Sequence, residues 1–178
     1  MTGYQELVTK IGDETVISVG ILSDTHLYSA NASFKKQCSR AFNGCEVIIH
    51  AGDLTDISIL QAFPGKEIHA VCGNTCNRSV QQVLPREKEI LLGGYSIAIT
   101  HGTGPRHNIE DRVFDRFPTA DCIIFGHSHL PICRKIGSTL IINPVSFQAT
   151  GRYGAGHSYG LLQIDSSGLS ASLHTLSG

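Results

Sequence analysis

Side chains that bind metal ions well recur where the apolar segments of this sequence end. SDTH follows VGIL, AGD follows EVIIH, GN follows EIHAVC, HG follows YSIAIT, and GHSH follows DCIIF. The candidate ligands are Asp24, His26, Asp53, Asn74, His101, His127 and His129. A single histidine is more often solvated, or held by one ordinary hydrogen bond, than bound to a metal. The repetition of one arrangement after five segments predicts a shared metal site instead.

The expected positions of these residues explain how they could meet. If each apolar segment is a strand of an open α/β sheet, the carboxyl ends of neighbouring strands open onto one crevice, where such folds bind ligands. Asp24 and His26 are two residues apart, as are His127 and His129. Residues at that spacing in an extended chain point to the same side, so both members of each pair can reach one cluster.

The set of ligand atoms favours particular metals. Nitrogen and oxygen ligands without thiolate suit Mn²⁺, Ni²⁺, Zn²⁺, Fe or Co²⁺ rather than Mg²⁺ or Ca²⁺, and Mn²⁺ is our first expectation. Four histidines, two aspartates and one asparagine exceed the ordinary coordination of one ion. They suit two divalent ions per chain that share a carboxylate.

The intervening sequence predicts an α/β fold. β-Branched runs predict strands at 15–22, 46–51, 67–72, 88–93, 95–100, 121–125, 139–143, 158–164 and 169–176. Helical periodicity predicts helices at 29–42 and 107–117, and more weakly at 56–63. Apolar strands separated by helices favour sheets buried on both faces, and the helix-poor end favours added antiparallel strands. We therefore expect two stacked mixed β-sheets flanked by helices.

Length and composition narrow the class of protein. The 178 residues suit a single domain over 1–178, with 1–14 either an edge strand or a mobile tail. The 14 basic and 15 acidic residues nearly balance, so charge does not indicate a nucleic-acid partner. No apolar run is long enough for a membrane span, and the start lacks the apolar core of a secretory signal. We expect a cytoplasmic protein, and the sequence leaves open whether it forms a homo-oligomer.

In their order along the chain, DTH, GD, GN, HG and GHSH resemble the five metal motifs of the calcineurin-like metallophosphoesterases. The likeness runs from about residue 19 to 147 and is greatest to the small bacterial and archaeal phosphodiesterases. That branch also includes the retromer scaffold subunit of eukaryotes. INPVS at 142–146 resembles the NPGS segment of the same branch, with Val145 in place of glycine.

The resemblance implies an αββα sandwich and assigns the ligands. It implies a first ion held by Asp24, His26, Asp53 and His129. It implies a second ion held by Asp53, Asn74, His101 and His127, with Asp53 as the bridge. Two ions about 3.5–4 Å apart lower the pKa of a shared water, and the hydroxide attacks phosphorus in line. The expected activity is hydrolysis of a small-molecule phosphate ester, a diester first, with Asp53, Asn74 and His101 in the catalytic machinery.

One position departs from the wider family. Many members carry a histidine after GN, followed by an acid, and that histidine is thought to protonate the leaving group. Here Thr75 and Cys76 follow GN. A threonine hydroxyl is far too weak an acid, and an ordinary thiol has a pKa of about 8.5. Members of the small branch also tend to lack that histidine, so the departure does not indicate an inactive protein.

A second function comes from a different class. A non-catalytic, metal-binding interaction scaffold of the retromer-subunit type would have the same fold. A non-catalytic scaffold is expected to have lost some of the ligand residues. All seven are present in this sequence, which favours the enzyme over the scaffold.

The remaining histidines and several arginines have weaker expectations. His50 is expected to pack at a strand end or to support a ligand. The histidines that match no ligand position are His69, His107, His157 and His174. The arginines in predicted loops that are candidates for contacting phosphate are Arg78, Arg106 and Arg152.

Overall fold

The strands form two sheets in a computed structural model that describes residues 9–11, 14–148 and 157–176. The first sheet has the order β11-β10-β2-β3-β4, with β1 paired to β2. Its strands are β1 (Thr9–Ile11), β2 (Glu14–Leu22), β3 (Val47–His50), β4 (Glu67–Ala70), β10 (Ser158–Asp165) and β11 (Gly168–Thr175). The second sheet has the order β5-β6-β7-β9-β8. Its strands are β5 (Glu87–Leu92), β6 (Tyr95–Thr100), β7 (Cys122–Ile124), β8 (Ile132–Ile136) and β9 (Thr139–Asn143).

Both sheets are mixed, and their parallel strands lie at the centre. In the first sheet β2, β3 and β4 are parallel, whereas β10 runs antiparallel to β2. In the second sheet β6, β7 and β9 are parallel, whereas β5 and β8 are antiparallel partners at the two edges. Each candidate ligand comes after the carboxyl end of one of five parallel strands, β2, β3, β4, β6 and β7.

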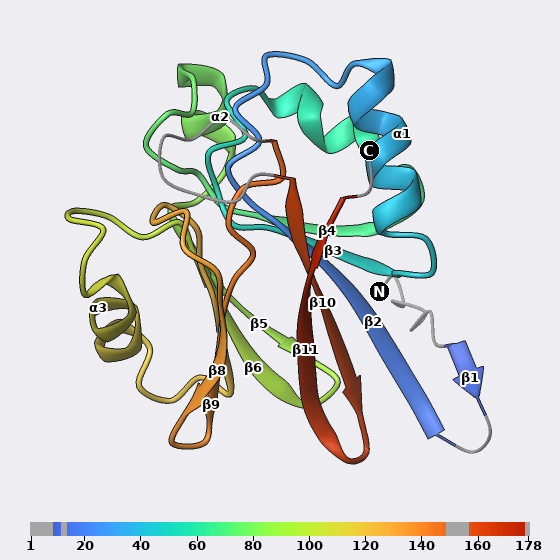
Figure 1. Cartoon of the computed structure of the whole chain (residues 1–178), viewed down its shortest axis with the longest axis vertical. Coiled ribbons are helices and arrows are strands. Elements are labelled where there is room, and N and C mark those ends of the chain that lie inside the picture. The colour runs from blue at the N-terminus through green and yellow to red at the C-terminus, as the bar shows by residue number, and fades with distance from the viewer. Residues whose placement is uncertain (1–8, 12–13, 149–156, 177–178) are drawn as a thin grey trace, which may run out of the picture.

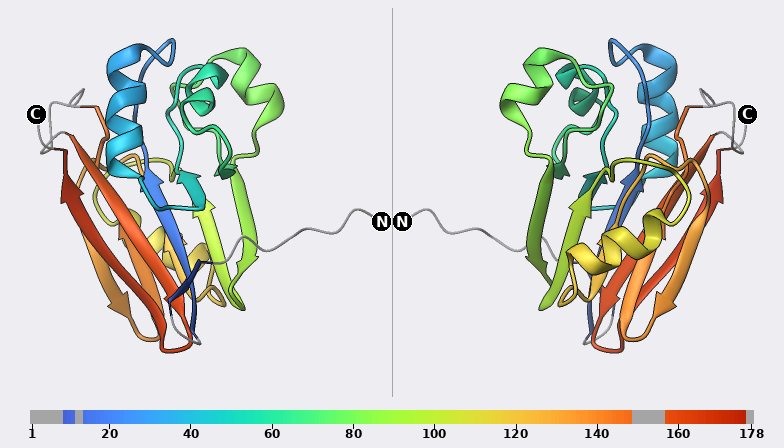
Figure 2. Two further views of the ribbon diagram at one scale, coloured as in Figure 1. Left: turned by 90° about the vertical axis from the view of Figure 1, so that its right-hand side faces the viewer. Right: turned by 90° about the vertical axis from the view of Figure 1, so that its left-hand side faces the viewer.

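Helices cover the outer faces of the two sheets (Figure 1). The helices are α1 (Ala32–Ala41), the 3₁₀ helix η1 (Ile57–Ala62), α2 (Arg78–Val83) and α3 (Ile109–Arg116). Figure 2 shows α3 lying across the outer face of the second sheet, where its Ile109 and Val113 belong to one buried cluster with Ile123 and Phe125. Phe34 and Phe42 of the α1 region pack with Leu22 and Ile48 of the first sheet.

The two sheets face each other across a third buried cluster. It contains Val19 and Ile21 of β2 together with Ile97 and Ile99 of β6. Because side chains alternate along a strand, Leu22 contacts the helical layer while Ile21 faces the opposite sheet. The layers therefore run helix, sheet, sheet, helix, and the predicted αββα sandwich is confirmed.

Helix boundaries differ from the predictions where local capping decides them. The helix predicted at 29–42 begins only at Ala32, because the Asn31 side chain accepts a hydrogen bond from the Phe34 N–H at 2.9 Å and acts as the N-cap. The weak helix predicted at 56–63 is a 3₁₀ helix, capped in the same way by Asp56. The short helix α2 was not predicted.

Two strands also differ from the predictions. The sequence of β8, ICRKI, has two cations in the middle and was not recognised as a strand. It is an edge strand that pairs only with β9, so its charged side chains can remain in water. Residues 9–11 form the edge strand that was one of two alternatives for 1–14; residues 1–8 and 12–13 lie outside the described residues.

The three buried clusters lead us to expect that the fold survives removal of metal. Their members are hydrophobic side chains, and none is a candidate ligand. Each fully buried isoleucine or leucine contributes about 1.5–3 kcal/mol to the free energy of unfolding, and a domain of this size buries many such side chains. Circular dichroism of chelator-treated protein should therefore match that of the metal-loaded protein in the far ultraviolet. A chain that unfolds on chelation would show instead that the ions hold the fold together.

Candidate metal centre

The candidate ligands leave the carboxyl ends of strands in both sheets. Asp24 follows β2, Asp53 follows β3 and Asn74 follows β4, all in the first sheet. His101 directly follows β6, and His127 follows β7, in the second sheet. Backbone hydrogen bonds join neighbouring loops: Asp24 N–H donates to Gly52 at 3.0 Å and His26 N–H donates to Asp53 at 3.0 Å. The site thus spans the junction of the two sheets.

Most of the candidate ligands have left-handed rather than extended backbone, and this conformation directs their side chains into the site. The φ angles of Asp24, His26, Asp53, His127 and His129 lie between 48° and 66°. The expectation that each i, i+2 pair lies in an extended segment is therefore wrong, although both pairs still reach the site. A non-glycine residue in a sparsely populated region costs about 1–3 kcal/mol, and such residues cluster at functional sites because surrounding contacts impose them.

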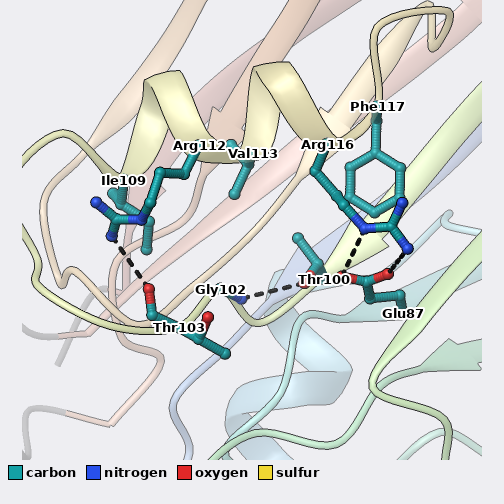
Figure 3. A pocket seen from close by; sticks show the side chains of 9 residues that line it. All are labelled: Glu87, Thr100, Gly102, Thr103, Ile109, Arg112, Val113, Arg116 and Phe117. Atoms are coloured by element: carbon teal, nitrogen blue, oxygen red, sulfur yellow. Dashed lines mark hydrogen bonds and ion pairs between the residues drawn. The ribbon is translucent and has the colours of Figure 1, made fainter.

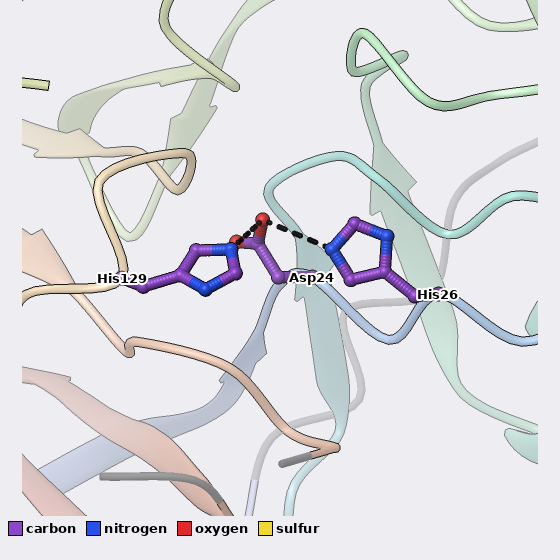
Figure 4. Close-up of side chains that lie close together, drawn as sticks. All are labelled: Asp24, His26 and His129. Atoms are coloured by element: carbon purple, nitrogen blue, oxygen red, sulfur yellow. Dashed lines mark hydrogen bonds and ion pairs between the residues drawn. The ribbon is translucent and has the colours of Figure 1, made fainter. Parts of the chain in front are cut away.

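Asp24, His26 and His129 form the first of two groups that could hold a metal ion among the described residues (Figure 4). Asp24 Oδ1 lies 2.9 Å from His129 Nε2 and 3.7 Å from His26 Nε2. Burial alone would raise the pKa of Asp24. The hydrogen bond to His129 and the nearby rings of His26 and His101 outweigh it and hold the pKa far below its usual range. Asp24 is therefore a buried carboxylate in its charged form.

Asp24, Asp53 and His101 form the second group. His101 Nε2 lies 3.2 Å from Asp53 Oδ2 and 4.0 Å from Asp24 Oδ1. The expected bridge by Asp53 stays a prediction. Asp53 Oδ2 is near His101 of the second group and lies 3.9 Å from His26 Nε2 of the first group. Asp24 is itself a member of both groups and is therefore the other residue that could bridge two ions.

The chemistry of His101 fits a bound cation. Its Nδ1 donates to the Ala51 carbonyl at 2.8 Å, because a carbonyl oxygen can only accept. In the neutral ring Nε2 then carries the lone pair, and this buried atom has no hydrogen-bond partner among the described residues. Burial alone would lower the pKa of His101, but the Asp53 contact and the charge of Asp24 outweigh it and raise the pKa. The negative charges of Asp53 and Asp24, which favour a proton on His101 Nε2, also favour a metal ion at this atom.

His127 and Asn74 meet beside this second group. His127 Nδ1 lies 3.0 Å from Asn74 Oδ1, and the His127 ring packs edge-on against His101 with centroids 5.3 Å apart. His127 Nε2 lies 2.9 Å from the Gly104 carbonyl, so the two ring nitrogens both face oxygens that can only accept, and a neutral ring donates to one of them. With the proton on Nε2 and donated to Gly104, Nδ1 keeps its lone pair on the side of Asn74, which is the arrangement that two ligands of one ion have. All seven predicted residues therefore gather at this junction.

The negative charge of Asp53 is supported by the chain around it. Its Oδ1 accepts the Thr75 N–H at 2.8 Å. Burial alone would raise the pKa of Asp53, and the His101 contacts and the Thr75 N–H lower it below the usual value. The Thr75 hydroxyl lies 3.2 Å from His26 Nδ1. Thr75 therefore contacts two candidate ligands, Asp53 through its N–H and His26 through its hydroxyl.

Sequence reasoning missed the role of the INPVS segment. Ser146 Oγ donates to the Asp24 carbonyl at 2.9 Å, and the Asn143 amide donates to the Gly126 carbonyl at 2.8 Å. These two buried side chains hold the DTH and GHSH loops in place. Val145 has a φ of 76°, so the position keeps the left-handed backbone that suits glycine even though valine occupies it. The resemblance to NPGS was the signal that could have identified this support.

His50 lies outside both groups among the described residues and contacts the residue between two candidate ligands. It is fully buried, and its Nε2 lies 3.2 Å from Thr25 Oγ1, between two ligand positions. Burial lowers the pKa of His50 to about 4, so the ring is neutral near pH 7. Besides His50 and His127, the histidines that belong to neither group among the described residues are His69, His107, His157 and His174.

A small cavity of about 80 Å³ opens beside the second group. Asn74, His101 and Thr103 line it together with Arg86, the cationic side chain at this cavity. Arg86 was not among the arginines considered from sequence. Of those, Arg78 begins α2, Arg106 lies in the loop before α3, and Arg152 falls outside the described residues.

Gly73 must lack a side chain for the two groups to form. A Cβ atom at this position would lie 2.1 Å from Asp53 Oδ1 and 2.4 Å from Asp53 N. Gly73→Ala is therefore expected to displace Asp53 or the Asn74 loop and to weaken metal binding sharply. Gly137→Ala, in the β8–β9 turn with open space around it, is the matched control. Isothermal titration with Mn²⁺ should separate the two variants, and equal affinities would contradict the steric argument.

Comparison with known proteins identifies the family. Residues 17–167 match the calcineurin-like phosphoesterase superfamily domain, and the chain belongs to this family. A probable metallophosphoesterase of Methanocaldococcus jannaschii is 31% identical, over 72% of this chain and 67% of that protein. A phosphodiesterase of the same organism is 24% identical, over 72% of this chain and 82% of that protein. The structure of Vps29 complexed with Zn²⁺ from Entamoeba histolytica shares the fold, with a TM-score of 0.62 and 20% identity over 89% of this chain and 98% of that chain.

Within the described residues, no helix is both long enough and apolar enough to cross a membrane.

Proposed function

We propose that this chain is a metal-dependent phosphodiesterase that hydrolyses a small phosphate diester. The observation that carries the proposal is the buried Nε2 of His101, which lacks a hydrogen-bond partner among the described residues and faces the carboxylates of Asp53 and Asp24. A lone pair and two carboxylates at this spacing form a stable arrangement with a divalent cation between them. The phosphodiesterase of M. jannaschii, at 24% identity, supports the diester as substrate class.

We further propose two ions in this site, with Mn²⁺ first and Ni²⁺, Zn²⁺, Fe or Co²⁺ as metals that the same ligand atoms suit. Asp24, His26 and His129 would hold one. Asn74, His101 and His127 would hold the other, and Asp53 lies between them. Bound divalent ions supply Lewis acidity toward the phosphoryl oxygens and a nucleophile from water near neutral pH.

The side chains of the site fix where charge is placed. Asp24 and Asp53 carry the negative charge that binds the ions. His101 and His127 are each held by a backbone carbonyl, which directs the other ring nitrogen into the site. Asn74 brings no charge, so the ion it contacts keeps more of its attraction for a phosphoryl oxygen. Arg86 at the adjoining cavity adds positive charge where an anionic substrate enters.

The test is metal-dependent hydrolysis. Protein stripped by chelation should be inactive toward bis(p-nitrophenyl) phosphate and should recover activity on titration with Mn²⁺, with Ni²⁺ and Zn²⁺ as comparison ions. p-Nitrophenyl phosphate, a monoester, is the matched substrate control. His174→Ala, on β11 and outside both groups, is the matched protein control.

The outcomes separate the competing functions. Faster hydrolysis of the monoester would keep the enzyme and reject the diester as its substrate class. Ion binding without hydrolysis of either ester would favour a non-catalytic scaffold of the retromer-subunit type, which has the same fold.

A further inference from the structure

The loop between β6 and α3 is held by one side chain, that of Arg112. From the middle of α3, its Nη1 donates to the carbonyls of His107 at 3.0 Å and Asn108 at 3.2 Å. Its Nη2 donates to the carbonyl of Thr103 at 3.1 Å (Figure 3) and to that of Pro105. One guanidinium therefore satisfies four backbone acceptors of a segment outside any helix or strand. A planar, charged group with five donors can do this, and charge-assisted hydrogen bonds are the stronger kind.

The residue between two of these acceptors contacts the metal centre. Gly104 lies between Thr103 and Pro105, and its carbonyl accepts the hydrogen bond from His127 Nε2 at 2.9 Å. The same Nη2 of Arg112 thus holds the backbone on both sides of the carbonyl that His127 requires. Arg112 does not donate to Gly104 itself, so its influence on His127 passes through the loop.

The Gly104 carbonyl decides which nitrogen of His127 is available. The Asn74 Oδ1, 3.0 Å from Nδ1, is also an acceptor, so a neutral ring donates either to Asn74 or to Gly104. A proton held on Nε2 by the Gly104 carbonyl leaves the Nδ1 lone pair free for an ion. Without that carbonyl, the ring is free to rotate or to carry its proton on Nδ1, and either change removes the lone pair from the site. Partners of this kind on metal-binding histidines affect metal affinity by about 10–100-fold.

We propose that Arg112 is a positioning residue for the metal centre: it holds the Gly104 carbonyl that fixes the tautomer and ring orientation of His127. The proposal rests on the proposed metal-dependent function, since it assigns His127 to one of the two ions. Arg112 touches neither ion nor substrate in this role.

The neighbouring Arg116 provides a matched control. It lies one helical turn further along α3 and lines the same surface groove. Its guanidinium pairs with Glu87 at 2.7 Å, and its hydrogen bonds among the described residues go to that carboxylate rather than to the 103–108 loop. Arg116→Ala therefore removes an arginine of the same helix while leaving the Gly104 carbonyl in place.

The experiment compares Arg112→Ala, Arg112→Lys and Arg116→Ala with the wild-type protein. Calorimetric titration with Mn²⁺ should show that Arg112→Ala lowers the affinity for one of the two ions by about 10–100-fold and leaves the affinity for the other unchanged. Arg112→Lys should recover part of the affinity, since a lysine carries the charge but cannot span four carbonyls. Arg116→Ala should match the wild type. Arg112→Ala that binds both ions with wild-type affinity would overturn the proposal.

A second measurement needs neither metal nor a destabilised variant. Nitrogen NMR of the chelated wild-type protein should show His127 protonated at Nε2, and Arg112→Ala should lose that resonance. A wild-type His127 protonated at Nδ1 would overturn the positioning role even if Arg112→Ala fails to fold. If the wild type binds no ion, the proposed function fails, while this signal still decides whether Arg112 acts on His127.

A double-mutant cycle separates positioning from general support. If Arg112 acts through His127, Arg112→Ala should have no further effect on ion affinity in a His127→Ala background. Additive losses in the double variant would mean that Arg112 affects the site by another route and would reject the proposal.

Discussion

Asp53→Asn is expected to lose nearly all hydrolytic activity and to bind divalent ions much more weakly than the wild type. Asp53 Oδ2 lies 3.2 Å from Nε2 of His101 in the second group and 3.9 Å from Nε2 of His26 in the first group. An amide preserves the shape of the side chain and an oxygen for the Thr75 N–H, but it removes the charge between the two ion positions. A loss of several kcal/mol of transition-state stabilisation corresponds to a fall of at least about 10³-fold in rate.

The measurement is elemental analysis with turnover of an activated diester, made on a set of variants. His129→Ala should chiefly lose the ion of the first group, and Asn74→Ala the ion of the second. Asp165→Asn, in an exposed turn where its carboxylate accepts from Ser167, is the charge-matched control. Asp53→Asn with two tightly bound ions and wild-type activity would reject the role of Asp53.

Asp24→Asn belongs in the same set, because Asp24 lies in both groups. If Asp24→Asn loses both ions and Asp53→Asn only one, Asp24 is the bridging ligand. This result would keep the two-ion site and change only the residue at its centre.

The members of the candidate site could be predicted from sequence because strand ends are easy to recognise. A β-branched run that stops at a glycine and a metal-binding side chain is a local signal, and parallel strands bring such signals to one edge. His101 directly follows β6 and His127 follows β7, so their meeting depends only on these strands being neighbours. The apolar strand-like runs separated by helical segments are equally local signals, and the sandwich was predicted from them and from the family resemblance.

The conformations and supports of the site could not be predicted, since they depend on contacts between distant segments. Nothing in DTH or GHSH indicates left-handed backbone at both ligands of each motif. Arg112 looks like an ordinary charged residue on the exposed face of an amphipathic helix. Its acceptors are backbone carbonyls, which carry no sequence signal. Asn143 and Ser146 act in the same way, across more than a dozen residues.

The rate of diester hydrolysis is expected to depend steeply on the pKa of the leaving group. Residue 75, the position where the family resemblance would place a histidine as general acid, is a threonine whose hydroxyl lies 3.2 Å from His26 Nδ1 and cannot act as an acid. The departing oxygen must then carry its own charge or take a proton from water. A positioned general acid contributes roughly 10²–10⁴-fold, so its absence should slow alkyl esters far more than nitrophenyl esters. Diesters of graded leaving-group pKa measure the slope.

Thr75→His should flatten that slope if the new imidazole reaches the leaving oxygen within about 3.2 Å. Thr75→Val is the matched control, since it removes the hydroxyl contact to His26 while both variants keep the backbone bond to Asp53. The structure argues against adding an acid at Cys76 to orient the imidazole. Cys76 is buried in the cluster of the helical layer and its sulfur accepts the Gly73 N–H, so a carboxylate there would lose its water.

A wild-type rate that hardly changes across the series, with chemistry shown to limit turnover, would mean that another group supplies the proton. His107 is then the first residue to test, because its exposed side chain lies in the loop that Arg112 holds beside the second group. His107→Gln would steepen the slope in that case and leave it unchanged otherwise. Thr75 would then keep only its contact with His26, and Thr75→Val would alter ion affinity without altering the leaving-group dependence.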